Sequence, residues 1–558
     1  MMRKITLLMS ALAISALCVV SALATPQADD AAIVRNLDVF NNLYKELNTY
    51  YVDSLAPEHA IETALQAMLG ELDPYTEYIP AKEAEDFMVV STGQYGGIGS
   101  YIIERKDSLH RGVYISSPSE GSPAARAGLR AGDKFIMIDG DSTAGWSSEN
   151  VSKRLKGQPH TSVHLVMQRP YAADSILTFD IMRETIDMNP VPYYGVTHGD
   201  IGYIVLTTFN EHSAARVREA LVALKKDPRV KHIVLDLRGN GGGVVEGAVQ
   251  IVGCFVPKGS LVLVTRGRAK SSERIYKTTD APVDTRIPLA VLIDGGSASA
   301  SEITAGALQD MDRAVIIGAR SFGKGLVQST RPLPYDGLLK VTTAKYYLPS
   351  GRPIQEIDYS QRDNEGTLVK TRADSVARTY RTTSGRVMPE GKGITPDLEV
   401  MPAAATQVLY ALVRDQSIFD FATQWAATHP TCPDPDHFQV TDELFDEFKQ
   451  FVKDGHYKAD ETNQEALKLF RENVKKEGYL TDSVSAQFDR LAEMLRHDTD
   501  RDMDLNRAEI SRLLSSEIMD RYYYQRGQYQ NGAITDECLA RASEMFAKPG
   551  EYKRLLKP

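Results

Sequence analysis

A lysine and a group of serines in this sequence have the residue types and spacing needed for nucleophilic catalysis. Lys324 lies in the stretch GARSFGKGLVQ, and three serines precede it in DGGSASASEITAGALQD. A serine hydroxyl becomes a strong nucleophile when a neighbouring base accepts its proton, and a neutral lysine can be that base. The lysine stretch has two rival interpretations, a phosphate-binding loop and a serine–lysine motif within one helical turn.

Both rival interpretations meet obstacles in the sequence. A phosphate-binding loop needs Ser or Thr directly after its lysine to hold magnesium, but Gly325 stands there. The serine–lysine motif needs Ser321 and Lys324 on one helical turn, and each of the two glycines in that turn lowers helix stability by about 1 kcal/mol. Its companion motifs S-D-N and K-T-G are absent from the chain. We therefore favour a lysine that acts on a remote serine.

The remote serine is one of Ser297, Ser299 and Ser301. The strand-like run LAVLID precedes them and an alanine-rich helical pattern follows, which places them at a helix N-terminus. Free N–H groups at such a terminus can stabilise an oxyanion. Ser299 and Glu302 also have the spacing of a capping box, so this segment alone favours a simple helix cap.

The lysine must be neutral when it accepts the proton. Free lysine has a pKa of about 10.4, and burial away from carboxylates lowers it. No acidic residue lies between Gly318 and Pro334, whereas Asp294 and Glu302 flank the serines and would hold the charge on the lysine if either paired with it. No histidine lies between positions 232 and 429, so lysine is the expected base.

The rest of the chain indicates the elements that position these residues. Residues 195–402 alternate between strand-like and helical runs, which is typical of an α/β domain. Within them, polar residues 358–390 predict an inserted surface loop. Residues 32–90 and 405–558 have helical patterns, and residues 92–186 consist of short β-type runs separated by turn signals.

The β-rich segment resembles a PDZ domain. The stretch SPAARAGLRAGDKFIMIDG is very similar to the PDZ signature of exported bacterial proteases. The resemblance implies that the domain binds the C-terminus of a peptide, whose carboxylate would meet the loop Gly97-Ile98-Gly99. The alternative is a β-rich domain with an ordinary glycine turn.

Several motifs in order, from about residue 32 to 402, resemble the carboxyl-terminal processing, or tail-specific, proteases of serine peptidase family S41. They are LDLRGNGGG, SASASE, FGKGLVQ, TTAKYYLPSGRPIQ and GKGITPD. The resemblance implies that Ser299 is the nucleophile, Lys324 its general base, and Gln328 the residue that orients the lysine. Two alternatives remain. One is a catalytically inactive, PDZ-bearing envelope scaffold or chaperone on the same fold, and the other is a crotonase-like enzyme.

The resemblance also implies roles for backbone groups and for one arginine. The oxyanion would accept hydrogen bonds from the N–H of Ala300 and of Gly241 or Gly242, and the sequence does not decide between the two glycines. Gly241 stands where many relatives have proline. Arg169 would help to couple PDZ occupancy to the active site, and the alternative is a solvated arginine at a strand end.

The implied fold class is multidomain α+β. A PDZ domain at 92–186 lies beside an α/β serine protease core of the ClpP/crotonase type at 195–402, with helical regions at 32–90 and 405–558. Arg3 and Lys4, the apolar run after them and Ala22-Leu23-Ala24 predict a secretory signal peptide at 1–24. An uncleaved anchor is the alternative. Export implies the periplasm or cell envelope.

Composition sets further limits on function. The chain has 558 residues and a net charge of −10, with no basic patch for nucleic acid. Its 11 histidines lack metal-ligand spacing, so we expect no metal and no cofactor. The acids from Asp498 to Glu509 resemble a calcium loop, but Met503 replaces the required glycine, and one charged helix is expected instead. A bridge between Cys432 and Cys538 stays open.

The sequence therefore predicts an exported serine endopeptidase. Its PDZ domain would recognise free, apolar protein C-termini, and a Ser–Lys dyad would cleave near them through an acyl-enzyme. The sequence leaves peripheral membrane association and homo-oligomerisation open, and it does not name the substrate.

Overall fold

The computed structural model describes residues 26–106, 110–172, 175–362, 368–370, 378–401, 406–456, 462–495 and 498–558, so the predicted signal peptide lies outside the described residues. The chain forms two units, one of the residues up to Ile79 with Thr330–Val341, the other of Pro80–Ser329 with Thr342–Pro558. In the first, helices α2 (Pro26–Tyr50) and α3 (Pro57–Gly70) precede strand β1 (Glu77–Ile79), which pairs antiparallel with the start of β18 (Leu338–Tyr347). No described helix is both long and apolar enough to span a bilayer.

A six-stranded sheet in the order β10-β11-β12-β15-β16-β23 forms the centre of the second unit. Its strands are β10 (Tyr193–Thr197), β11 (Ile201–Val205), β12 (His232–Asp236), β15 (Leu289–Ile293), β16 (Val315–Gly318) and β23 (Leu398–Glu399). All neighbours pair in parallel except β10 with β11. The continuous apolar runs of β15 and β16 suit such a sheet because both of its faces are covered.

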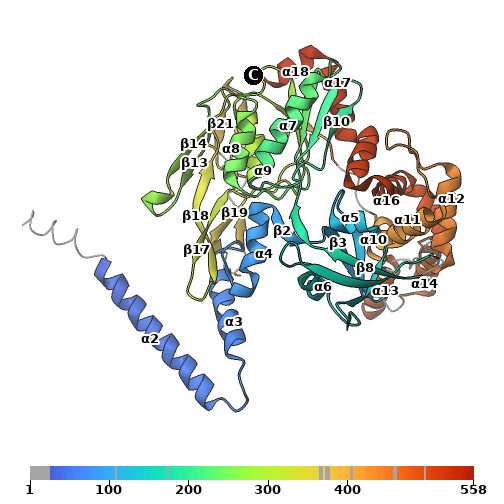
Figure 1. Cartoon of the computed structure of the whole chain (residues 1–558), viewed down its shortest axis with the longest axis horizontal. Helices are drawn as coiled ribbons and strands as arrows, with labels where there is room; N and C mark the ends of the chain where they lie inside the picture. The colour runs from blue at the N-terminus through green and yellow to red at the C-terminus, as the bar shows by residue number, and fades with distance from the viewer. Residues whose placement is uncertain are drawn as a thin grey trace, which may run out of the picture. The chain divides into compact units, whose positions relative to one another are not determined.

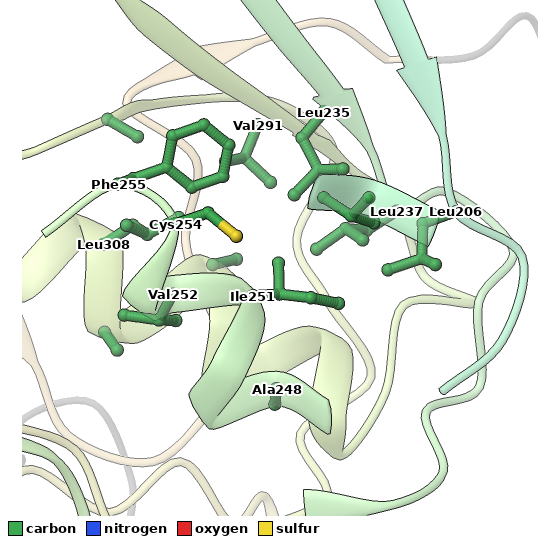
Figure 2. Close-up of a cluster of buried hydrophobic side chains, with 14 of the residues drawn as sticks. Leu206, Leu235, Leu237, Ala248, Ile251, Val252, Cys254, Phe255, Val291 and Leu308 are labelled. Carbon is green, nitrogen blue, oxygen red and sulfur yellow. The ribbon is translucent and has the colours of Figure 1, made fainter. Parts of the chain in front are cut away.

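Helices α7 (Ser213–Lys226), α8 (Val245–Gly253) and α9 (Ala300–Asp310) cover one face of this sheet (Figure 1). Alternate strand residues point at them because successive strand side chains face opposite sides. Figure 2 shows Leu235 and Val291 from the sheet near Ile251, Val252 and Cys254 of the α8 region. Cys254 is fully buried there as a small apolar residue.

The opposite face is covered by the end of the chain. The other alternate strand residues, such as Val234, Ala290 and Leu292, pack against helices α17 (Glu537–Phe546) and α18 (Pro549–Leu555). Leu539 and Met545 are fully buried in this contact. The last two helices of the C-terminal helical region therefore contribute to the hydrophobic core of the α/β domain.

A second sheet and two hairpins complete this domain. The sheet contains β13 (Leu261–Arg266), β14 (Arg274–Lys277), β17 (Leu326–Pro332) and β18, and the 3-10 turn Lys270–Ser272 lies between β13 and β14. Residues 358–390 were expected to be a surface loop, but their described parts include two hairpins. These are β19 (Ile357–Arg362) with β20 (Leu368–Lys370) and β21 (Thr379–Arg381) with β22 (Val387–Pro389). Arg386 anchors the second hairpin through ion pairs to Asp312 and Asp397.

The segment expected to be a PDZ domain is a β-sheet domain with two short helices. Its sheet has the order β3-β4-β5-β7-β8, with β6 on β5, while β2 pairs with β9. The elements are β2 (Gln94–Gly97), β3 (Ser100–Arg105), β4 (Gly112–Pro118), α5 (Pro123–Ala127), β5 (Lys134–Ile138), β6 (Asp141–Ser142), α6 (Ser148–Leu155), β7 (Ser162–Gln168), β8 (Ile176–Met182) and β9 (Glu184–Asp187), and helix α4 (Ala81–Thr92) leads into them. Ile98, Phe135 and Leu165 are buried in its own core.

The C-terminal helices form another apolar core around Phe445, Phe448 and Leu514. They are α10 (Gln407–Arg414), α11 (Ser417–Thr428), α12 (Asp442–Phe451), the π-helical turn Val452–His456, α13 (Thr462–Lys476), α14 (Asp482–Met494), α15 (Thr499–Leu505) and α16 (Arg507–Thr535). The single charged helix expected over 498–509 is wrong, because Asn506 separates α15 from α16.

The acids in this region are held by lysines of neighbouring helical segments. Asp504 pairs with Lys449 at 2.7 Å and Asp500 pairs with Lys453 at 2.7 Å. Among the residues that the structure describes, no three His, Cys, Asp or Glu side chains gather as metal ligands. The possible bridge between Cys432 and Cys538 is not formed, because both cysteines are free.

Candidate active site

Three loops meet at the carboxyl edge of the central sheet, where ligand sites of parallel sheets lie. They follow the adjacent parallel strands β12, β15 and β16. Asp294 joins two of them, because its Oδ1 accepts hydrogen bonds from the N–H groups of Gly239 and Gly296 at 2.9 Å each. The edge therefore brings LDLRGNGGG, SASASE and FGKG together.

Ser299 occupies a strained position at the start of α9. Its φ of 55° and ψ of −112° lie in a region that residues with a side chain rarely adopt, and such strain persists where the surrounding structure enforces it. Gly242 packs directly against this turn. A Cβ atom on Gly242 would lie 2.8 Å from Cβ of Ser299 and 2.9 Å from N of Ala300, so only glycine fits there.

The other two serines of the motif are engaged in structure. The Ser297 hydroxyl donates to the carbonyl of Leu237 at 2.8 Å and accepts from the N–H of Asp294 at 3.0 Å. The Ser301 hydroxyl donates to the carbonyl of Asn240 at 2.7 Å. Both serines are fully buried, while Ser299 is half-buried. The geometry therefore favours Ser299 among the three candidates.

Glu302 connects the serine segment to the lysine loop. Its Oε2 accepts hydrogen bonds from the N–H groups of Ser299 and Lys324 at 2.9 Å each. Its Oε1 accepts from the N–H of Gly323 at 2.7 Å and from the hydroxyl of Ser321 at 2.6 Å. The carboxylate is fully buried. The sequence indicated only the cap at Ser299, because the spacing of a capping box cannot reveal a second loop that folds back onto the same carboxylate.

Burial raises the pKa of Glu302, and the hydrogen bonds that it accepts act in the opposite direction. Tyr346 is also buried here, and its hydroxyl lies 3.4 Å from the carbonyl oxygen of Ser299. The Glu302 carboxylate is thus a buried hydrogen-bond acceptor, and the groups that donate to it have little access to water as an alternative partner. A buried donor that loses its acceptor lowers the free energy of unfolding by about 1–3 kcal/mol.

We expect Glu302→Gln to lower both stability and activity. The glutamine NH₂ group would face two backbone N–H donors that now donate to the carboxylate. Each donor left unpaired should lower the free energy of unfolding by about 1–3 kcal/mol. The peptide cleavage that the sequence predicts should fall at least tenfold, measured alongside thermal unfolding. Glu246→Gln, at an exposed position in the first turn of α8, is the matched control and should change neither quantity. Full stability and activity in Glu302→Gln would contradict this role.

Lys324 lies between β16 and β17, and its side chain is half-buried. Gln328 lies four residues further on, in β17, and its Nε2 donates to Oγ1 of Thr342 at 3.1 Å. The neighbouring strand thus holds the amide in one orientation. That Gln328 orients the lysine stays a prediction.

The three groups expected to stabilise an oxyanion lie on the two sides of Ser299. Ala300 is the first residue of α9, and Gly242 closely approaches it from the loop after β12. The N–H of Gly242 donates to Oδ1 of Asn240 at 2.9 Å, whereas Gly241 is exposed. The choice between Gly241 and Gly242 stays open.

Acids at the end of a helix are usually solvated, so the sequence predicts that Asp310 and Asp312 are surface charges, but the structure places neither on the surface. Asp310 is 1% exposed and pairs with the equally buried Arg352 at 2.9 Å. Asp312 pairs with Arg386 at 2.7 Å. These pairs fix the end of α9 against the segment after β18. Local sequence patterns do not reveal these pairs, because each partner lies more than 40 residues away along the chain.

The candidate carboxylate loop of the β-sheet domain lies between β2 and β3. The Ile98 carbonyl accepts from the N–H of Ala124 at 2.9 Å, and the Gly99 carbonyl accepts from the N–H of Ser119 at 3.0 Å. Gly99 has a φ of 73°, and a Cβ there would lie 2.5 Å from Cβ of Ser122. The loop Gly97–Gly99 is thus held in place from its carbonyl side.

Arg169 differs from the solvated arginine that was its alternative interpretation. Its guanidinium makes two hydrogen bonds to the buried carboxylate of Asp133, at 2.8 and 2.7 Å, and one to the carbonyl of Gly128 at 2.8 Å. These partners lie within the same domain. Coupling between Arg169 and the candidate active site stays a prediction.

Comparisons with known proteins agree with this arrangement. Residues 200–362 match the model of peptidase family S41, residues 114–169 match a PDZ domain, and residues 408–546 match the C-terminal helical domain of a probable PDZ-protease. A carboxy-terminal-processing protease of Bartonella bacilliformis is 36% identical over 360 residues, which cover 64% of this chain and 81% of that protein. A probable CtpA-like serine protease of Staphylococcus aureus is 34% identical over 321 residues, 57% of this chain and 62% of that protein.

Solved structures give similar matches. A photosystem II D1 C-terminal processing protease is 29% identical and covers 65% of this chain and 87% of that chain, with a TM-score of 0.36. The PDZ domain of a carboxy-terminal protease from Vibrio cholerae, solved in complex with a peptide, is 27% identical and covers 17% of this chain and 97% of that chain, with a TM-score of 0.15.

Proposed function

Because this chain belongs to the carboxy-terminal-processing proteases of peptidase family S41, which are serine peptidases with a PDZ domain, we propose that it cleaves proteins near their C-termini with a Ser299–Lys324 dyad. The observation that carries the proposal is the buried carboxylate of Glu302, which holds the backbone of Ser299 and of Lys324 through the same oxygen. A shared anchor of this kind keeps nucleophile and base in a fixed relation, as covalent catalysis requires.

In the proposed reaction, Oγ of Ser299 attacks the carbonyl carbon of the scissile peptide bond while its proton passes to Nζ of Lys324. The N–H groups of Ala300 and of Gly241 or Gly242 stabilise the resulting oxyanion. The C–N bond then breaks, and the proton on the lysine passes to the leaving amine. Water attacks the acyl-enzyme ester with the lysine again as base, and the ester C–O bond breaks to regenerate Ser299.

Two features support peptide entry at this place. A cavity of about 380 Å³ opens beside the motifs and is lined by Gly295, Arg320–Gly323, Gln355–Ile357 and Tyr359. Phe322, next to the lysine loop, is 49% exposed and gives this opening an apolar side chain. A peptide side chain next to the scissile bond can occupy such a space.

We assign C-terminal recognition to the PDZ domain. The peptide adds as a strand beside β3, and N–H groups of the loop Gly97–Gly99 receive its carboxylate. We also retain export to the periplasm or cell envelope, which the pattern of residues 1–24 supports. A non-catalytic scaffold is disfavoured, because a scaffold does not need the strained backbone at Ser299.

Amidation of the substrate C-terminus tests the recognition step. Two fluorescent peptides of one sequence, one with a free carboxylate and one with an amide, are titrated against the full chain carrying Ser299→Ala. Removing the charge should weaken binding about tenfold, since charged hydrogen bonds are worth about 1.5–3 kcal/mol. An amide placed instead on a side-chain carboxylate near the N-terminus of the peptide is the control. Equal affinities for the free and amidated C-termini would show that this loop does not sense the carboxylate.

A further inference from the structure

The PDZ domain and the C-terminal helical domain are joined by buried polar contacts. Arg105 of β3 pairs with Asp420 of α11 at 2.6 Å, and its side chain is 5% exposed. Ser117 of β4 donates its hydroxyl to Asp520 of α16 at 3.0 Å. Arg105, Ser117 and Asp520 are buried, so removing a partner would leave a buried polar group without that hydrogen bond. These contacts hold α11 and α16 against the PDZ sheet.

A cavity of about 370 Å³ remains between α16 and this face. On the PDZ side it is lined by Tyr101–Ile103 of β3 and by Ser116 and Ser117 of β4. On the helical side it is lined by Glu517, Asp520, Gln525 and Gln528. The helix bends between these two pairs, where Tyr524 has a φ of 57°. The cavity therefore has an aromatic and aliphatic floor and a polar wall.

The wall of this cavity is acidic. Its two charged residues are Glu517 and Asp520, and both lie near the guanidinium of Arg521, which also donates to the carbonyl of Phe419. Burial raises the pKa of Asp520 to about 6, so its carboxyl is mostly ionised at pH 7.5. Glu517 forms a hydrogen bond at 2.9 Å with Arg521 and is 34% exposed. Two carboxylates thus share one guanidinium, and the wall keeps a net negative charge together with amide oxygens that a cation can contact.

The direction of a bound peptide follows from the proposed recognition. Among the strands that the structure describes, β3 pairs with β4 alone and forms the edge of its sheet, so a peptide can add along its outer side. The carboxylate would sit at the loop Gly97–Gly99, which precedes β3. The rest of the peptide must then run along β3 toward Arg105, which makes it antiparallel to the strand.

The faces of β3 fix where the peptide side chains point. Ile102 packs against the PDZ core, and Glu104 accepts from the N–H of Ser148 at the start of α6. Tyr101, Ile103 and Arg105 alternate with them and face the helical domain. Directly opposite residues of paired strands place their side chains on the same face. With the terminal residue opposite Ser100, the penultimate and fourth-from-last residues share the face of Tyr101 and Ile103.

We infer that the cavity between β3 and α16 is a specificity subsite for the penultimate and fourth-from-last residues of the substrate, and that it prefers lysine or arginine there. The inference rests on the proposed recognition of C-termini by the PDZ domain. The cavity wall accepts hydrogen bonds from the cation, and its floor of Tyr101 and Ile103 contacts the aliphatic part of the side chain. The helical domain thereby takes part in substrate choice.

Peptides that differ at one position test the subsite at pH 7.5. Fluorescent ten-residue peptides with a free C-terminus carry lysine or glutamate at the penultimate position, and they are titrated against the full chain with Ser299→Ala. Lysine should bind about threefold to fivefold more tightly than glutamate, as one solvent-accessible ion pair allows. The same exchange at the third-from-last residue, which faces α6, is the internal control.

Two helix variants assign the effect to the cavity. Glu517→Gln should bring the lysine-to-glutamate ratio at the penultimate position close to one. Glu509→Gln is the matched control, since Glu509 also lies on α16, pairs with an arginine of the same helix and is 35% exposed. It should leave the ratio unchanged. Circular dichroism confirms that both variants are folded.

The outcomes separate the subsite from the recognition on which it rests. If amidation weakens every peptide but the penultimate exchange has no effect, or an effect that survives Glu517→Gln, the subsite is wrong and recognition stands. If amidation changes nothing, recognition fails and the subsite falls with it. A preference for lysine that requires both a free carboxylate and Glu517 supports the inference.

Discussion

Ser299→Ala is expected to reduce peptide cleavage by at least about a thousandfold, because removing a serine nucleophile leaves only the catalysis that binding and the oxyanion site provide. The folded structure should be retained, since Ser299 is half-buried and its backbone N–H still donates to Glu302. The measurement is mass spectrometry of a peptide with an apolar C-terminus, together with thermal unfolding of the variant.

Ser297→Ala is the matched control for this experiment. It removes a hydroxyl only two residues away that holds Leu237 and Asp294, so it should lower stability by about 1–3 kcal/mol. The nucleophile is untouched, and the variant should still cleave the peptide below its unfolding temperature. Substantial cleavage by Ser299→Ala, or complete loss with a folded Ser297→Ala enzyme, would show that the nucleophile has been misplaced.

The sequence predicts the central fold well because its signals are local. The apolar runs around LAVLID and AVIIG are typical of buried parallel strands, and the alternation with helical segments predicts an α/β domain. The S41 fold class and the PDZ domain are confirmed. The covering of the second face of the sheet by α17 and α18 was not predicted, because packing between segments so far apart leaves no sign in local periodicity.

The motifs of the candidate site could be predicted from the sequence. The tertiary contacts that hold these motifs in place could not. Serine and lysine can be found by residue type, and the capping box identifies the start of α9. The anchoring of the lysine loop by Glu302 and the burial of Asp310 against Arg352 depend on tertiary contacts. An acid at the end of a helix is usually solvated, so the sequence predicts a surface position for Asp310. That prediction is wrong, because Asp310 is buried.

Lys324→Arg separates a base from a mere positive charge. Arginine keeps a cation of similar length, but with a pKa above about 12 it cannot accept the serine proton. If Lys324 is the general base, the arginine variant should be as inactive as Lys324→Ala, with cleavage reduced by at least about a thousandfold. Lys345→Arg, at an exposed position on the adjacent strand β18, is the control and should retain activity.

The pH dependence of the natural enzyme gives a second test of the same role. Only the neutral amine accepts a proton, so kcat/KM should rise with pH as a larger fraction of Lys324 becomes neutral. A Lys324→Arg enzyme that is folded by circular dichroism and still cleaves peptide well would overturn the dyad mechanism, even with Ser299 essential, and would leave the lysine only an electrostatic role.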